Sequence, residues 1–255
     1  ISAEASSEYR KLTKTAFWMY AKGIPTNDFG YNNLGATAVR PYGGTESTYE
    51  DQSLASVMGS VTYSLLDRYL LSVNARGDGS SMVGDDNTWG FFPSVSFTWD
   101  MKKENFLANV KPLSMLKLRT GLGQAGNLGG ISAYTTMNTV RQTGIVPVKS
   151  SPTVTLGMVR NNNPDLKWEK THSTNLGLEV GFFDNRLQLE AEYYFKKTTD
   201  AFMSKKISDV NGFESYIINS GTIENRGYNV TLTATPVKFK DFYWIVSGSM
   251  SKIFN

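Results

Sequence analysis

The segment 177–197 alternates apolar and polar positions along two arms, which residues 183–186 separate. The apolar positions of the two arms are Leu178, Val180, Phe182, Leu187, Leu189, Ala191, Tyr193 and Phe195. Because successive side chains of a strand point to opposite faces, each arm is predicted to be a strand with one apolar and one polar face. The short break makes the two strands neighbours in a hairpin.

The same alternation recurs along the whole chain and predicts about nine strands of roughly eight to eleven residues each. The predicted strands span residues 9–20, 57–64, 69–76, 93–99, 116–123, 177–182, 187–196, 228–235 and 242–250. An all-β, antiparallel fold follows from this pattern.

The predicted connections differ in length in a regular way. Short turns at 65–68, 183–186 and 236–241 take turns with long loops at 21–52, 77–90, 124–170 and 198–225. The connection 100–115, on the short-turn side, is intermediate. One end of the sheet is therefore short-looped and the other long-looped, which is the rule for outer-membrane barrels, with short periplasmic turns and long extracellular loops. A soluble sandwich or jelly roll remains the alternative, because it also has one polar face.

Aromatic and charged residues favour the membrane barrel. Aromatic residues cluster near the predicted strand ends, where amphipathic rings lie at a membrane boundary. In a membrane barrel the polar positions of each strand face the lumen, and the apolar positions face lipid. The charged residues that we expect to face it are Arg76, Arg119, Glu179, Glu190 and Glu192.

Composition agrees with a β-rich protein and excludes several classes. The 255 residues include 23 glycines, with 13% aromatic and 19% charged residues. A net charge of +3 with scattered basic residues argues against nucleic-acid binding, and the absence of cysteine excludes disulfides and thiolate metal sites. Neither a secretion signal nor an apolar run long enough for a membrane helix is visible.

Motifs that resemble enzymatic or cofactor sites have simpler explanations. Residues 121–126 match GxGxxG, but no helix is predicted after them and no acid follows about twenty residues later, so we expect glycines where a strand leaves the barrel wall. His172 is the only histidine and is expected to pack at the membrane boundary. Glu190 and Glu192 have the separation of a glycosidase pair but no cleft motif. We expect no enzyme activity, catalytic residue, metal site or cofactor; calcium binding by Asp78, Asp85 and Asp86 stays open.

Five segments together resemble the barrel of SusC/RagA-type TonB-dependent outer-membrane transporters of Bacteroidetes. They are YSLLDRYLLSVNARGDGSS (63–81), WGFFPSVSFTW (89–99), LKLRTGLGQAGN (116–127), NPDLKWEKTHSTNLGLEVGFFDNRLQLEAEYYFKKTTD (163–200) and NSGTIENRGYNVTL (219–232). The resemblance implies a location in the bacterial outer membrane and a 22-stranded barrel closed by an N-terminal plug. It also implies a SusD-like surface lipoprotein as a lid, and import of glycans, oligosaccharides or peptides with energy from TonB.

The chain departs from that family in what it lacks. We find no plug, no TonB-contacting segment and too few strands, so residues 1–255 are expected to be an internal, C-terminal-side part of one barrel domain. A passive or structural outer-membrane barrel and a soluble carbohydrate-binding β-sandwich are the alternatives.

Recognition is expected in the long loops, because loops on a rigid scaffold commonly bind ligands. The aromatic residues that we expect to face ligand or lid are Tyr42, Trp89, Tyr134, Phe213 and Tyr216. Anchoring at the membrane boundary is the alternative for each of them.

Overall fold

The computed structural model describes residues 1–255 except 24–25, 27, 29–44, 149–150, 161 and 208–214. Within the described residues the chain forms β1 (Ser2–Met19), β2 (Thr45–Leu65), β3 (Tyr69–Ser80), β4 (Trp89–Asp100), β5 (Leu113–Asn127), β6 (Thr139–Val148), β7 (Ser151–Arg160), β8 (Glu169–Phe182), β9 (Leu187–Lys206), β10 (Ser215–Lys238) and β11 (Tyr243–Phe254). The only helical elements of this part are two short 3-10 turns, η2 (Asp85–Asn87) and η3 (Met101–Lys103).

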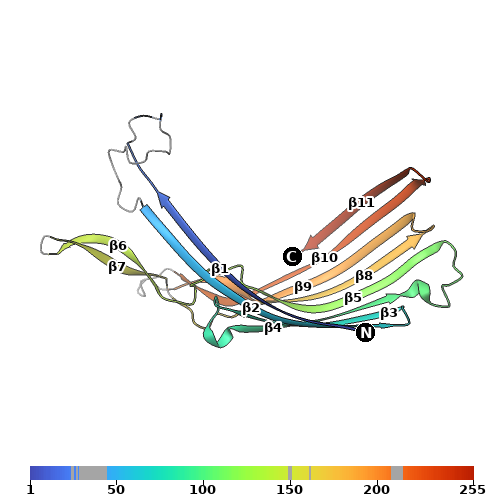
Figure 1. Ribbon diagram of the computed structural model, residues 1–255, viewed down its shortest axis with the longest axis horizontal. Coiled ribbons are helices and arrows are strands. Elements are labelled where there is room, and N and C mark those ends of the chain that lie inside the picture. Colours follow the sequence, from blue (N-terminus) through green and yellow to red (C-terminus); the bar gives the residue numbers. More distant parts are fainter. Residues whose placement is uncertain (24–25, 27, 29–44, 149–150, 161, 208–214) are drawn as a thin grey trace.

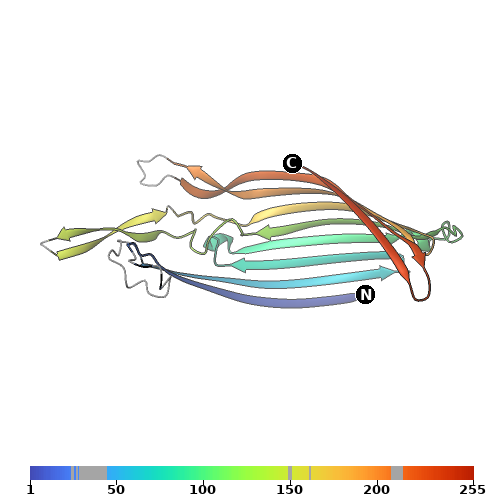
Figure 2. The same cartoon turned by 90° about the horizontal axis from the view of Figure 1, so that it is seen from above.

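The strands form one large antiparallel sheet and one separate hairpin. In the described residues the sheet has nine strands, the number that the alternation predicted, in the order β1-β2-β3-β4-β5-β8-β9-β10-β11. β6 pairs only with β7. The sheet is strongly curved and open, while the β6–β7 hairpin extends away from its long-loop end (Figures 1 and 2). The fold class is therefore the expected antiparallel all-β wall, in the form of part of a barrel.

The predicted tight turns have the backbone conformations that such turns require. Positive φ angles occur at Leu66 and Asp67 between β2 and β3, and at Phe183, Asp184 and Asn185 between β8 and β9. Left-handed conformations of this kind reverse the chain within a few residues. Both turns were predicted at these positions from the breaks in the alternation.

The third predicted turn, 236–241, begins too early. β10 continues to Lys238, and the chain reverses where Phe239 donates a backbone hydrogen bond to Phe242 at 2.7 Å. Pro236 suggested the turn, but it lies in a register shift between Ala234 and Val237. A proline is tolerated at such a bulge because its missing N–H is not needed there.

The strands are longer than predicted, at 12–24 residues in the large sheet. β2 begins at Thr45, inside the predicted loop 21–52, and the β9–β10 pair continues well into the predicted loop 198–225. Polar residues dominate these extensions, so the apolar alternation that identified the strands is absent from them. The hairpin β6–β7 was also missed inside the loop 124–170. Its Pro147 and Pro152 lie opposite each other in the register.

The apolar face of the sheet is uncovered. Val61, Val73, Leu122, Leu176 and Leu232 lie on this face, and each is between 49% and 55% exposed. A small hydrophobic core lies on the opposite, polar face. It consists of buried Val83, Phe92 and Trp168, against which the partly buried Leu54, Leu128 and Ile131 pack. A soluble sandwich would bury its apolar face, so the arrangement is that of a wall whose apolar side meets lipid. No helix in the described part of the chain has the length and hydropathy needed to cross a membrane.

The connection between β4 and β5, on the short-turn side, is folded around one carboxylate. Glu104 accepts hydrogen bonds from the Tyr69 hydroxyl at 2.6 Å, from Trp99 Nε1 at 3.1 Å and from Arg68 at 3.0 Å. These donors, Tyr69 first, hold the pKa of Glu104 below its usual value. The carboxylate therefore ties the aromatic ends of β3 and β4 to this connection.

Candidate functional site

The polar face of the sheet gathers the five charged residues predicted to face a lumen. Cross-strand pairing aligns Glu179 with Lys117 on one side and with Glu190 on the other, and it aligns Gly177 with Arg119 and with Glu192. Arg76 lies on the same face. Residues paired across neighbouring strands point to the same side of the sheet, and the pairing through β3, β4, β5 and β8 puts Arg76 on the side of Arg119 and Glu179. All five thus share one surface.

The half of this surface nearer the short turns is charged. An Arg119 Nη2 atom lies 3.0 Å from Glu179 Oε1 in an ion pair. Arg119 and Glu192 also line a shallow cavity of about 370 Å³, together with hydroxyl and amide side chains of β4 and β8. No group of three or more potential metal ligands is found among the described residues.

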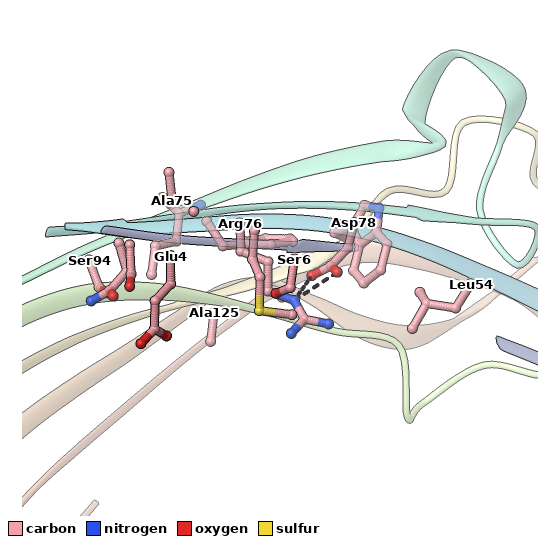
Figure 3. Close-up of a pocket in the computed structure, with 16 residues that line it drawn as sticks. Glu4, Ser6, Leu54, Ala75, Arg76, Asp78, Ser94 and Ala125 are labelled. Carbon is pink, nitrogen blue, oxygen red and sulfur yellow. Dashed lines mark hydrogen bonds and ion pairs between the residues drawn. The ribbon is translucent and has the colours of Figure 1, made fainter. Parts of the chain in front are cut away.

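The half nearer the long connections contains a second, more buried ion pair. Arg76 Nε donates to both carboxylate oxygens of Asp78 at 2.8 Å, and Arg76 Nη2 donates to Ser56 Oγ at 3.1 Å. Ser56 and Asp78 are buried, at 2% and 7% exposure. The guanidinium is therefore held in one orientation, and it faces a cavity of about 490 Å³ on the polar side of β1–β4 (Figure 3).

Asp78 belongs to the carboxylates for which calcium binding stayed open. Its side chain is engaged by Arg76, whereas Asp85 and Asp86 lie in the 3-10 turn η2. The three do not form a metal-ligand group in the described residues.

Gly126, the last glycine of the GxGxxG match, has a structural role that it shares with Gly90. β5 runs through the match to Asn127 and no helix follows. A Cβ at Gly126 would fall 2.2 Å from the ring of Phe92, and a Cβ at Gly90 would fall 2.4 Å from it. The Phe92 ring also contacts Trp168 edge-on, with centroids 5.5 Å apart. The two glycines thus make space for the core cluster on the polar face.

Residues 163–168, which we call the strap, cross the polar face and join strands that are distant in the sequence. On one side Gly84 donates its backbone N–H to Leu166 at 2.9 Å, and Trp168 Nε1 donates to the Thr88 carbonyl at 3.2 Å. On the other side Asn163 donates to the Ile217 carbonyl at 2.8 Å. The strap therefore links the β3–β4 connection to β10 above β5 and β8.

Asn219 strengthens this link. Its amide oxygen accepts from the Lys167 N–H at 3.0 Å, and its amide nitrogen donates to the carbonyls of Lys167 and Asp200 at 2.8 Å. Sequence reasoning missed the strap, because its Pro and Asp residues indicate only a loop. Two large apolar residues in that loop, Leu166 and Trp168, were the signal in the sequence that the loop packs against the sheet.

The aromatic loop candidates are not brought together. Trp89 is 62% exposed and lies against Gly79 on the apolar face. The hydroxyl of Tyr134 accepts a hydrogen bond from the Asp51 backbone at 3.0 Å, and Tyr216 pairs with Lys205 at the end of the β9–β10 extension. Tyr42 and Phe213 lie outside the described residues. His172 faces Gln124 across the β5–β8 pair and lines a groove with Val95 and Leu122.

Comparison with known proteins decides the family. The family model described as "TonB dependent receptor-like, beta-barrel" matches residues 4–252. The chain belongs to this TonB-dependent receptor family. Its members are outer-membrane transport proteins rather than enzymes, so this barrel segment is an outer-membrane protein, as the one-sided sheet and the resemblance to the SusC/RagA group indicated.

Relatives of this TonB-dependent receptor segment are much longer than the chain. A TonB-dependent receptor of Formosa agariphila is 33% identical over 99% of the chain and 26% of its own length. The TonB-dependent receptor SusC of Bacteroides thetaiotaomicron is 39% identical over 78% of the chain and 20% of its own length. The chain thus spans about a quarter or less of these relatives.

Solved structures share the fold of the segment. The RagAB peptide transporter superposes with a TM-score of 0.82 at 24% identity, covering 98% of this chain and 27% of that chain. The siderophore receptor PirA of Pseudomonas aeruginosa superposes with a TM-score of 0.52 at 13% identity, covering 82% of this chain and 38% of that chain. The curved open sheet is therefore a fold that also occurs as part of these larger solved chains.

Proposed function

We propose that the chain is part of the wall of an energised outer-membrane importer, which takes up glycans, oligosaccharides or peptides. In this proposal residues 1–255 belong to one barrel domain of a longer receptor, whose plug and remaining strands lie elsewhere. The observation that supports it best is the one-sided sheet. Its apolar face is uncovered, and its charged face and the inward-folded core lie together on the other side. The five charged residues of that face then line the lumen.

Transport in cells tests the proposal. The complete receptor, expressed from its full reading frame, is expected to support uptake of a fluorescent oligosaccharide or peptide only while TonB is present and the proton gradient is intact. Uptake should fall to the level of receptor-free cells when TonB is deleted. Uptake that persists without TonB and without the gradient would instead identify a passive barrel.

The proposal includes a SusD-like surface lipoprotein as a lid. The long connections gather at one end of the sheet, and the β6–β7 hairpin extends beyond it with Ile145, Val154, Leu156 and Met158 about half or more exposed (Figure 1). Exposed apolar surface of this kind commonly marks a protein contact. Purification of the tagged receptor in mild detergent should recover the lipoprotein in stoichiometric amount. Recovery of the receptor alone under conditions that retain other outer-membrane complexes would argue against a lid.

A further inference from the structure

Four basic residues lie on the apolar face of the sheet, near the end with the long connections. They are Lys170 of β8, Lys197 of β9, Arg226 of β10 and Lys252 of β11, and we call them the basic patch. A row of residues paired across these strands marks the apolar face, namely Leu178, Ala191, Val230 and Met250. Each member of the patch lies an even number of residues from the row residue of its own strand, so its side chain projects from the same face.

The basic patch follows the tilt of the strands. From β8 to β11 its members lie eight, six, four and two residues beyond the row, toward the long connections. The short turns shift in the same direction. The β2–β3 turn lies at this row, which continues through Leu118 and Trp99 to Tyr69, whereas β8 and β10 run past the row to Phe182 and Lys238. Because barrel strands are tilted by about 35–45°, a line that steps in this way stays at one depth in the membrane.

That depth is the boundary of the hydrocarbon layer. Between the turn 183–186 and the pair of His172 and Lys197, this face of β8 and β9 presents only uncharged side chains: Thr174, Leu176, Leu178, Val180, Phe182, Leu187, Leu189, Ala191, Tyr193 and Phe195. From Thr174 to Phe182 this band is nine residues long, and about 9–11 residues of a tilted strand cross the hydrocarbon layer. The long connections of such barrels are extracellular, so the basic patch lies at the headgroups of the outer leaflet.

The positive charge of the patch is not balanced by the protein. Of its members, only Lys197 has an acidic partner among the described residues: its Nζ lies 2.8 Å from Glu224 Oε1. Glu224 is also the one acidic residue on this face of β8 to β11 in the described part of the chain. Lys252 Nζ lies 5.0 Å from the centroid of the Phe254 ring, an arrangement that holds a cation beside an interfacial aromatic residue.

The rest of the apolar face has no such excess. On β1 to β5 its charged residues within the described strands are Lys11 and Asp51, which form an ion pair at 2.9 Å. The unbalanced charge is therefore confined to one sector of the wall. Clusters of basic side chains at a membrane surface attract anionic lipid headgroups.

A groove on the same face adjoins the patch. Its volume is about 430 Å³, and its side chains on this face are apolar at Val73, Val95 and Leu122 and polar at Gln124 and His172. His172 pairs with Lys197, so the polar end of the groove lies beside the patch. An acyl chain would occupy the apolar part, with its headgroup at the basic residues.

We propose that the basic patch binds the phosphate groups of lipopolysaccharide, the phosphorylated glycolipid of the outer leaflet, with an acyl chain of the same molecule in the groove. The patch extends across four adjacent strands, about 14 Å at the usual strand spacing. This width suits a headgroup with several anionic groups better than the single phosphate of a phospholipid. The site lies on the outside of the wall and is independent of the cargo that the barrel transports.

The test measures binding of fluorescent short-core lipopolysaccharide to the complete receptor, both dispersed in one non-ionic detergent, by fluorescence polarisation. Lys197→Gln and Arg226→Gln should each weaken binding about fivefold. Glu224→Gln, which removes the acidic residue of this face, should strengthen binding severalfold. Added salt should weaken binding to the wild type, because screening reduces attraction between exposed charges.

Lys196→Gln is the matched control for Lys197→Gln. It makes the same change one residue away, on the lumen face of β9, and it should bind like the wild type. Unlabelled dephosphorylated lipopolysaccharide, phosphatidylglycerol and inorganic phosphate are the competitors, and each should displace the probe at least tenfold less well than intact lipopolysaccharide. Folding of every variant is checked by heat-modifiable migration on gels.

Three results would overturn the inference. Lys196→Gln could weaken binding as much as Lys197→Gln, both Lys197→Gln and Arg226→Gln could fold and bind like the wild type, or one of the competitors could displace the probe as well as intact lipopolysaccharide does. Displacement by phosphatidylglycerol would identify a general anionic-lipid surface, and displacement by inorganic phosphate a simple anion site. The test involves no transport, so its failure leaves the proposed import function standing.

Discussion

Glu104 shows how much local structure one side chain can organise. Its partners Arg68, Tyr69 and Trp99 come from the ends of β3 and β4, and the nearby Lys102 Nζ donates to the carbonyls of Leu107 and Val110 at 2.9 and 3.0 Å. The amphipathic rings of Tyr69 and Trp99 at this end of the wall are thus hydrogen-bonded to protein. No periodic pattern predicts such a contact, because it depends on a folded connection bringing Glu104 back onto the strands.

The lowered pKa of Glu104 predicts a specific dependence of stability on pH. The folded pKa lies below the unfolded value of about 4.3, so the carboxylate stabilises the fold fully above that value and loses this effect as pH falls through the folded pKa. Glu104→Gln should lower the thermal unfolding temperature of the detergent-solubilised receptor at neutral pH, and the difference from wild type should shrink below about pH 4.

Asp241→Asn is the control for Glu104→Gln, because Asp241 lies in another short turn and has no side-chain hydrogen bond among the described residues. It should show no comparable pH-dependent difference. A Glu104→Gln difference that stayed constant down to acidic pH would contradict the role assigned to the ionised carboxylate.

The strap is the element that alternation could not predict. Alternation located the strands and the shared face of Arg76, Arg119 and the three glutamates, because every second side chain of a strand lies on the same face. It failed at the strand extensions, whose sequences do not alternate regularly, and in the strap, whose hydrogen-bond partners in the β3–β4 connection and β10 lie 52–82 residues away in the sequence. Contacts at that range depend on the register of several strands at once.

Gly84 provides the sharpest test of the strap. Its φ of −62° suits any residue, but a Cβ there would fall 1.7 Å from the Pro164 carbonyl oxygen. Gly84→Ala must therefore displace the strap backbone, and we expect a cost of about 1–3 kcal/mol in unfolding free energy with faster proteolysis of the β3–β4 connection. Gly77→Ala is the control, since a Cβ at Gly77 meets nothing within 4 Å. Equal protease resistance of the two variants would mean that the strap contact does not hold this end of the wall.

At the scale of the whole molecule, the exposed apolar face predicts opposite responses at adjacent residues. Val95 lies on the apolar face of β4 and Ser96 on the polar face. Val95→Arg should cost about 2–4 kcal/mol in folding stability in lipid bilayers, because charge on a lipid-facing position is unfavourable. Ser96→Arg should fold and insert almost normally. Unfolding titrations in vesicles measure both; a barrel that tolerated Val95→Arg better than Ser96→Arg would reverse the assignment of faces.

The strap also has a consequence for the order in which the wall can form. It contacts the β3–β4 connection on one side and β10 on the other, so its contacts join the two ends of a row of five strands, β4, β5, β8, β9 and β10. Local hairpins form before contacts that need long loops to close. We therefore expect the strap contacts to form late, after β8, β9 and β10 have paired in register. Until then Trp168 and Phe92 do not share a core, and we expect the unfinished wall to expose these apolar side chains to aggregation.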